Sequence, residues 1–278
     1  MLFKDTTILL KYLKGQPYSS VCLIGEGWSS VTFQADDFII RFPKHDLQDY
    51  IKEKKICDFL RDKTNVLLPR TELCRGEIPY VRHKKIGGYD WNLMTIDKLS
   101  AKELTLLAKD IALFFHEIHQ QKTKYIAPTF VPVTPDDINN AFMNGLDGHL
   151  LQELLDIYKN TTLNPVQSSS LIHGDFSYEN STLDKNNRLY GVFDWCNSGM
   201  GDYIFDFVTL HTFFPQHFVE NVISQYQEMS DKDFDFKRFR KMYLLRNIYL
   251  LYWKHKKSAL EPTMLSDKVT EILNKAAR

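Results

Sequence analysis

The amino-acid sequence predicts an α+β fold, in which a small N-terminal antiparallel sheet with one helix precedes a larger, mainly helical part. Short apolar runs separated by turn residues occupy residues 21–42, the pattern of strands joined by hairpins. After residue 206 the sequence is mostly of helical type, with a strongly apolar stretch over residues 237–253. We expect two domains, covering residues 1–85 and 86–278.

The N-terminal part is predicted to begin with a helix that leads into the strands. A second helix, over residues 46–61, carries Glu53 on its apolar face. A carboxylate on a buried face needs a cationic partner or a strong set of hydrogen bonds, and Arg41 on the preceding strand is the candidate. The strands before this helix are expected at residues 21–24, 31–34 and 38–42.

Beyond the second helix, the pattern alternates between short extended pieces and long amphipathic stretches. The expected segments are two strands within residues 69–81, a crossing between the two parts at 82–88, a buried helix at 101–121, one or two helices within 136–159 and a flexible lead at 167–170.

Composition indicates an ordinary globular protein. The chain has 278 residues, of which 44% are hydrophobic, enough for a sizeable core. Lysine plus arginine and aspartate plus glutamate both number 35, so no net field attracts nucleic acid or an anionic membrane. The four cysteines form no Cys-x-x-Cys pair, which argues against a zinc site or disulfides. No apolar stretch is long enough to span a membrane, so we expect a soluble, cytoplasmic monomer.

The most informative segment is residues 171–180, which contains the pattern His-x-Asp-x-x-x-x-Asn. Asp175 and Asn180 are five positions apart, as in the catalytic loop of kinases. Phosphoryl transfer needs a carboxylate that orients the attacking hydroxyl and ligands that hold Mg²⁺ against the phosphate. We therefore predict Asp175 as the catalytic residue, with Asn180 and Asp194 as metal ligands.

A short hairpin explains how Asp194 can approach the loop. Residues 181–183 and 189–193 have strand character, and the Asp-Lys-Asn-Asn sequence between them is typical of a turn. A tight hairpin places its two ends side by side. The alternative is a chance Asp/Asn-rich loop, but chance would also have to supply the hairpin and its apolar approach to Asp194.

These motifs resemble the aminoglycoside phosphotransferase family, relatives of the protein kinases and of choline kinase. The resemblance implies a two-lobed, protein-kinase-like fold with the nucleotide held between the lobes. It also covers four segments farther toward the N-terminus. The matching segments are His173 to Asn180, Phe193 to Trp195, Gly201-Asp202 with Asp206-Phe207, and residues 24–30, 38–44, 85–88 and 114–119.

The predicted nucleotide-binding residues lie in the first strands. Small residues in a strand-turn-strand let backbone N–H groups approach phosphates, although Gly-x-Gly in a hairpin can also be a simple turn. Arg41 stands where protein kinases carry lysine, and Lys44 is a second candidate phosphate contact. No Walker-type motif occurs. The predicted set is Gly25, Gly27, Ser29, Ser30, Arg41, Glu53 and Lys44.

Four further residues complete the predicted site. We expect His173 to support the catalytic loop by hydrogen bonding, and the resemblance implies that Asp206 braces the same loop. Glu179 and Asp202 are the acidic residues nearest to the metal ligands in sequence, and we predict that they bind a cationic acceptor. Asp202 could instead cap the next helix.

The sequence thus predicts a phosphotransferase with an alcohol group as acceptor. It would transfer the γ-phosphate of ATP or GTP, with Mg²⁺, to an aminoglycoside antibiotic. Relatives with the same loop phosphorylate macrolides, choline, homoserine or sugars, so these acceptors remain alternatives. A nucleotide-binding regulator without catalysis is a further alternative, against which the intact Asp175, Asn180 and Asp194 argue.

Overall fold

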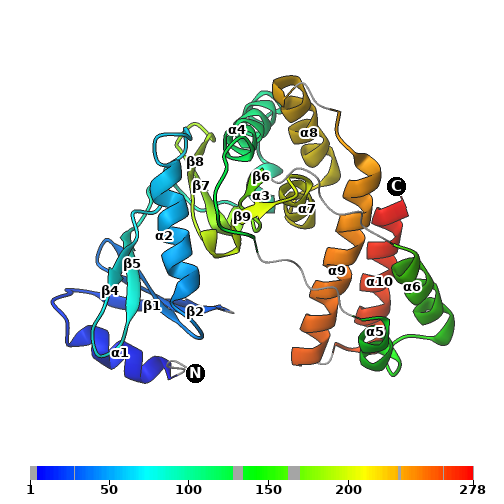
Figure 1. Cartoon of the computed structure of the whole chain (residues 1–278), viewed down its shortest axis with the longest axis horizontal. Coiled ribbons are helices and arrows are strands. Elements are labelled where there is room, and N and C mark those ends of the chain that lie inside the picture. The colour runs from blue at the N-terminus through cyan, green and yellow to red at the C-terminus, as the bar shows by residue number, and fades with distance from the viewer. Residues whose placement is uncertain are drawn as a thin grey trace.

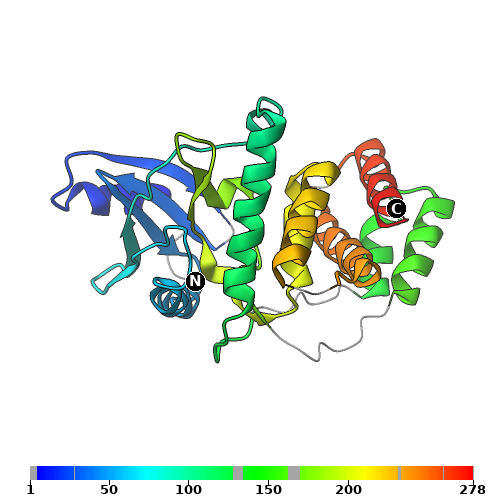
Figure 2. The ribbon, with the colours of Figure 1, turned by 90° about the horizontal axis from the view of Figure 1, so that it is seen from above.

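The chain has the predicted α+β architecture. We describe it from a computed structural model, which places residues 5–27, 29–127, 134–161, 170–230, 233–258 and 260–277. The N-terminal sheet lies at one end of the molecule and a group of C-terminal helices lies at the other (Figures 1 and 2). Helix α4 (Ala101–His119) runs between them.

An antiparallel sheet forms the N-terminal end. Asp36, in the turn between its second and third strands, adopts a left-handed conformation with φ of 49°, which aspartate tolerates better than most residues. The side chains of Phe33 and Phe42 pack edge to face and are covered by Leu9 and Leu13 of α1 (Thr6–Lys14). The strands, in spatial order, are β1 (Val21–Glu26), β2 (Ser30–Ala35), β3 (Phe38–Pro43), β5 (Tyr80–Lys84) and β4 (Glu72–Cys74).

Helix α2 (Gln48–Leu60) connects the sheet with the rest of the molecule. Its buried residues include Tyr50, Glu53 and Ile56, so the predicted apolar face is present and the carboxylate lies within it. The helix packs on a short 3₁₀ turn, η2 (Trp195–Asn197), next to the proposed metal ligand. This contact places the carboxylate of the N-terminal part close to the catalytic loop.

The core beneath the catalytic loop is aromatic. Phe114 and Phe115 of α4 contact Phe176 of the loop, and Phe114 also contacts Trp195. All four side chains are almost completely buried. Close packing of large rings leaves few alternative arrangements, so the loop rests on a rigid base.

The catalytic loop lies between two short pairs of strands. The predicted hairpin is formed by β7 (Ser181–Leu183) and β8 (Leu189–Val192). A pair that the sequence analysis did not predict joins β6 (Ser170–Ile172) to β9 (Gly199–Gly201). Most of the flexible lead predicted for residues 167–170 falls outside the described residues.

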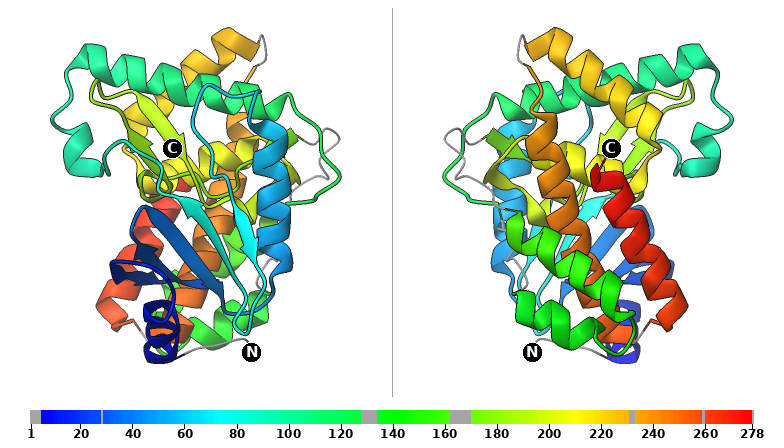
Figure 3. Two further views of the ribbon diagram at one scale, coloured as in Figure 1. Left: turned by 90° about the vertical axis from the view of Figure 1, so that its left-hand side faces the viewer. Right: turned by 90° about the vertical axis from the view of Figure 1, so that its right-hand side faces the viewer.

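Of the remaining helices, those within residues 135–160 and 236–277 lie together at the far end of the molecule (Figure 3) and form a second hydrophobic core. None of the described helices is long and apolar enough to cross a bilayer. Their bounds are α3 (Leu93–Ile96), α5 (Pro135–Phe142), α6 (Gly148–Asn160), α7 (Ile204–Phe213), α8 (Gln216–Ser230), α9 (Phe236–Ser258) and α10 (Pro262–Ala277).

Two details differ from the sequence predictions. The crossing segment expected at residues 82–88 is still strand as far as Lys84, because β5 pairs with β3 along residues 38–41. The short helix α3 was not predicted, since one turn is too brief to show a period. The division at residue 85 stays a prediction, because Tyr50 of α2 shares a buried cluster with Val81 and Cys196, which lie on either side of it.

Candidate active site

The buried carboxylate of Asp206 holds the start of the catalytic loop. Its two oxygens accept hydrogen bonds from the backbone N–H groups of His173 (3.0 Å) and Gly174 (2.7 Å). The Nε2 atom of His119, on α4, lies 3.0 Å from the same carboxylate. Asp206 therefore has the bracing contacts predicted for it, and Gly174 can adopt φ of 79° because it has no Cβ.

His173 links the loop to the end of the hairpin. Its Nε2–H donates to the carbonyl oxygen of Phe193 (3.1 Å), while Nδ1 accepts the backbone N–H of Asp175 (3.2 Å). Burial lowers the pKa of His173, which favours this neutral ring with one donor and one acceptor nitrogen. These are the hydrogen bonds expected of a supporting residue.

The carboxylate of Asp175 is contacted by the side chains of Asn197 and Arg246. The Asp175 side chain is 34% exposed. Burial raises the pKa of Asp175, and the nearby cation of Arg246, on α9, opposes that rise. The Nδ2–H of Asn197 is 3.4 Å from the second carboxylate oxygen. An accessible carboxylate with a raised pKa suits a group that orients a hydroxyl and accepts its proton.

Asn180 and Asp194 flank the open end of the hairpin, opposite its turn. The backbone N–H of Phe193 donates to the carbonyl oxygen of Asn180 (3.0 Å), so the two ends of the hairpin lie together as predicted. The Nδ2–H of Asn180 donates to the carbonyl oxygen of Asp175 (2.9 Å), and Oδ1 accepts no hydrogen bond from the described residues, so it can act as a ligand. One amide oxygen and one carboxylate are the hard donors that Mg²⁺ prefers, so these residues fit this ion.

Asp194 occupies a strained backbone position. Its φ of 62° and ψ of 65° lie in the left-handed region, where aspartate is tolerated at some cost. Burial alone would raise the pKa of Asp194, but the guanidinium of Arg41 holds it below its usual value. The carboxylate is therefore ionised, as a metal ligand must be.

Arg41 connects the carboxylates of two distant segments. Its Nη1 lies 3.0 Å from Glu53 Oε2 and its Nη2 lies 2.7 Å from Asp194 Oδ1. The predicted pairing of Arg41 with Glu53 is thus present. The planar guanidinium can reach both acids at once, which a lysine ammonium cannot do with the same geometry.

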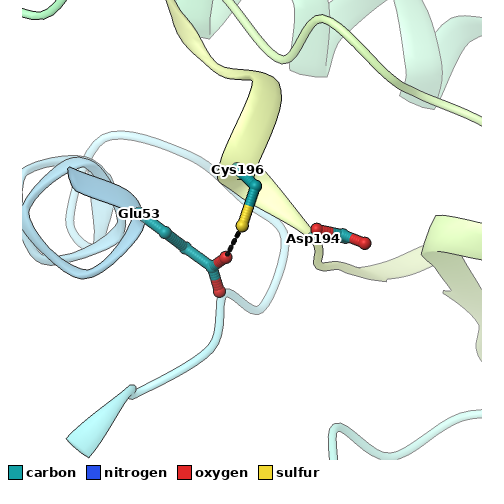
Figure 4. A group of neighbouring side chains, drawn as sticks. All are labelled: Glu53, Asp194 and Cys196. Carbon is teal, nitrogen blue, oxygen red and sulfur yellow. Dashed lines mark hydrogen bonds between the residues drawn. The ribbon is translucent and has the colours of Figure 1, made fainter. Parts of the chain in front are cut away.

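A thiol completes this cluster. Cys196 donates its S–H to Glu53 Oε2 over 3.0 Å (Figure 4). The possible ligand atoms of Glu53, Asp194 and Cys196 lie within 4.8 Å of one another. Because the Arg41 cation bonds both carboxylates, and burial raises the pKa of Cys196 far above its usual value, this cluster is an ion-pair network rather than a second metal site.

A cleft of about 830 Å³ lies beside these residues, within the size range of small-molecule sites. Gly25, Gly27, Arg41 and both proposed metal ligands line it. The full lining is residues 24–27, Thr32, Gln34, Ile39, Arg41, His83, Lys85, Ile86, Asp90, Trp91, residues 178–180, Thr182, Phe193 and Asp194.

Four predicted nucleotide contacts lie outside this lining, and one of them, Glu53, is paired with Arg41. Lys44 instead donates to Glu26 Oε1 (2.7 Å) and to the carbonyl oxygen of Gly27 (2.8 Å), so it braces the glycine turn. Ser30 is buried, with its hydroxyl 3.3 Å from that of Thr32. The carbonyl oxygen of Ser29 accepts the backbone N–H of Lys44.

The two predicted acceptor-binding acids have different surroundings. Glu179 is exposed and lines the cleft. Asp202 is buried, forms an ion pair with Arg238 and accepts the backbone N–H of Ile204 at the start of α7. Asp202 thus makes a contact of the helix-capping kind from the position before Tyr203, which is the N-cap residue of α7, and its role in acceptor binding stays a prediction.

Sequence reasoning missed several side chains around the loop. It assigned no functional role to His119, Arg246, Asn197 or Cys196. Asn197 and Cys196 follow Asp194 closely in sequence, which is the one local signal they carry. No local pattern could have identified Arg246, because only the tertiary fold brings α9 to the loop.

Comparison with known proteins supports the fold described above. The sequence model of the phosphotransferase enzyme family matches residues 20–241. The GDP and kanamycin complex of APH(2″)-IIIa superposes with a TM-score of 0.73 and 19% identity, covering 98% of both chains. ADP-bound aminoglycoside phosphotransferase APH(2″)-Ib gives 0.68 and 23%, again over 98% of both chains. Macrolide 2′-phosphotransferase MphH from Brachybacterium faecium gives 0.62 and 13%, over 96% of this chain and 98% of its own. At these identities the similarity shows a shared, kinase-like fold.

Proposed function

The chain belongs to the phosphotransferase enzyme family, whose members transfer phosphoryl groups to hydroxyl groups, and we propose that its acceptor is an aminoglycoside antibiotic. The observation that carries the phosphoryl-transfer chemistry is the position of Asp175, Asn180 and Asp194 around one end of the hairpin. Kinase chemistry needs a base and metal ligands in this relation.

Asp175 orients the acceptor hydroxyl and takes its proton as the acceptor oxygen forms a bond to the γ-phosphorus. The bond between the γ-phosphorus and the bridging oxygen breaks in the same transfer, and the nucleoside diphosphate leaves. Asn180 and Asp194 would hold Mg²⁺, which offsets the charge of the phosphates when it is bound. Arg41 keeps Asp194 ionised and joins it to Glu53 of α2. His173 and Asp206 fix the backbone of the loop, so the carboxylate is in place before substrate arrives.

The cleft is proposed to bind ATP or GTP. Gly25 and Gly27 leave space in which backbone N–H groups can approach phosphates. Lys44 holds their turn in position, and its own contact with phosphate, like those of Ser29 and Ser30, stays a prediction. Structural neighbours include complexes with GDP, ADP and ATP, which supports a nucleotide at this place.

The choice of acceptor is supported by neighbours that bind kanamycin and gentamicin. Glu179 is exposed beside Asn180 and can attract an ammonium group. Asp202 would first have to separate from Arg238. A macrolide is the second candidate, because a macrolide phosphotransferase shares the fold and the cations of Arg238 and Arg246 reduce the negative potential near the base.

The direct test is a panel of aminoglycosides, macrolides and metabolic alcohols assayed for acceptor-dependent release of ADP or GDP. Asp175→Asn should reduce kcat with the best acceptor and leave nucleotide affinity nearly unchanged, because the side chain contacts the acceptor. A variant within about tenfold of wild type, roughly 1.4 kcal/mol of barrier, would show that Asp175 is not the base. Turnover of uncharged alcohols alone would move the assignment away from antibiotics.

A further inference from the structure

A buried arginine approaches the catalytic carboxylate from outside the catalytic loop. Arg246 projects from α9, and its Nη2 lies 3.7 Å from Asp175 Oδ1. Its side chain is only 7% exposed. Its Nη1 donates to Thr212 Oγ1 of α7 (2.9 Å), and its guanidinium carbon lies 5.9 Å from the ring centre of Phe205. The guanidinium is therefore held in place by α7 as well as by its own helix.

The carboxylate of Asp175 is contacted on both oxygens. Asn197 approaches Oδ2 and Arg246 approaches Oδ1. Hydrogen bonds join the backbone of Asp175 to the side chains of His173 and Asn180 and fix its main chain. They do not prevent the Asp175 side chain from rotating. Among the described residues, two side chains contact the carboxylate, and of these two Arg246 is the charged one.

We propose that Arg246 is a positioning residue for phosphoryl transfer, which sets the orientation of the Asp175 carboxylate from α9. The inference rests on the proposed function, in which Asp175 orients the acceptor hydroxyl. A transferring phosphoryl group carries negative charge on its equatorial oxygens, and a bare carboxylate beside the acceptor would repel it. The Arg246 cation offsets that repulsion while it holds the carboxylate in one rotamer.

A purely structural role makes a different prediction. If Arg246 only filled the interface between α7 and α9, its replacement would lower stability and leave the chemistry of folded molecules intact. Removal of a buried cation is expected to affect stability in both cases. The decisive measurement is therefore turnover by folded enzyme, with its separation into kcat and nucleotide KM.

The test compares Arg246→Met, Arg246→Lys and wild type under saturating Mg-nucleotide, with the best acceptor of the panel. Misplacement of a reacting group by about 1 Å can cost about 100-fold, so we expect a loss of that order in kcat for Arg246→Met. Nucleotide KM should stay close to wild type. The loss in kcat should be smaller for Arg246→Lys. In a third variant, Arg246→Ala, added guanidinium ions at non-denaturing concentration should partly restore turnover.

Arg188→Met is the control. Arg188 forms an ion pair with Asp110, and its side chain is 41% exposed, whereas that of Arg246 is 7% exposed. The control variant should change stability by less than about 1 kcal/mol and keep the kcat of wild type. If Arg246→Met behaves in the same way, with kcat within about tenfold of wild type, the positioning role is overturned.

A second measurement does not depend on the acceptor. Unfolding midpoints of Asp175→Asn, Arg246→Met and the double variant should be non-additive, because the two side chains interact directly. Additive shifts would overturn the inference. If wild type phosphorylates no acceptor while the cycle is non-additive, the proposed function fails and the contact between Arg246 and Asp175 still stands.

Discussion

The geometry of this site depends on a few charged residues whose side chains lie on buried faces. Glu53 and Arg41 are each less than one-tenth exposed, and each depends on the other for compensation of its charge. The sequence indicated this pair because a carboxylate on an apolar helix face needs a partner. It did not indicate that the same arginine would also reach Asp194.

Glu53→Ala should therefore destabilise the protein and reduce its activity. Removing one partner of a buried pair typically costs about 3–5 kcal/mol, and we expect the lower end because Arg41 keeps Asp194. Urea unfolding and steady-state kinetics would measure both effects.

The matched control is the exposed pair of Glu72 with Arg82 on the sheet. Glu72→Ala should change stability by less than about 1 kcal/mol. Equal effects of Glu53→Ala and Glu72→Ala would contradict the buried-pair argument.

A buried histidine away from the active site should give stability a pH dependence. His211 packs against Tyr243, and its Nδ1 has no hydrogen-bond partner among the described residues. Burial lowers the pKa of His211 from 6.5 to about 4. The unfolded chain then binds the proton more tightly, so stability is full above pH 6.5 and is lost as pH falls toward 4. The loss is on the order of 3 kcal/mol.

His211→Phe should remove this dependence, because the ring is kept and the titration is lost. Unfolding curves between pH 7.5 and 4 would show a shallower decline than wild type, with the exposed His149→Gln as control. An unchanged slope in His211→Phe would exclude this histidine as the source.

At the scale of elements, the site consists of a loop suspended between two pairs of short strands. The hairpin of β7 and β8 was predictable because its turn residues and strand residues are contiguous. The pairing of β6 with β9 was not, since three-residue strands show no period and their partners are far apart in sequence. Helices α2 and α4 were predictable in place, because each is long enough for its apolar residues to recur over several turns, whereas the single turn of α3 is not.

Gly174→Ala should distort the catalytic loop. A Cβ added to Gly174 would lie 2.5 Å from the carbonyl oxygen of Asn197, and φ of 79° is unfavourable for alanine. We expect a loss of about 1–3 kcal/mol in stability and a larger proportional loss in kcat, because the hydrogen bond to Asp206 and the position of Asp175 both depend on this backbone.

Gly148→Ala is the control for that substitution. Gly148 begins α6, and nothing lies within 4 Å of its added Cβ. It should keep wild-type stability and turnover. Full activity in Gly174→Ala would show that the loop tolerates the shift.

At the scale of the molecule, the cleft joins segments from both ends of the chain. The glycine turn and Arg41 come from the sheet, whereas Asn180 and Asp194 come from the catalytic loop and hairpin. Local sequence patterns identified the residues of each segment. That the sheet and the catalytic loop face one cleft was implied by the resemblance to the aminoglycoside phosphotransferase family and not by the spacing of these residues. Arg246 shows what local patterns cannot predict, because the sequence around a residue on a distant helix does not indicate that it will lie beside the catalytic loop.

This convergence predicts that Mg-nucleotide stabilises the whole molecule. A ligand that binds only the folded state adds about 2.7 kcal/mol at a concentration of 100 Kd, which corresponds to a rise in Tm of roughly 5–10 °C for a chain of this size. Without Mg²⁺, in the presence of chelator, the rise in Tm should be smaller, because the negatively charged phosphates then face the carboxylate of Asp194 with no cation between them.

Asp194→Ala should abolish the difference in Tm between the two conditions, and Asn180→Ala should reduce it, since each removes one proposed ligand. Thermal unfolding with ATP and with GTP would test both nucleotides. Equal shifts with and without Mg²⁺ in wild type would show that Asn180 and Asp194 do not hold the metal.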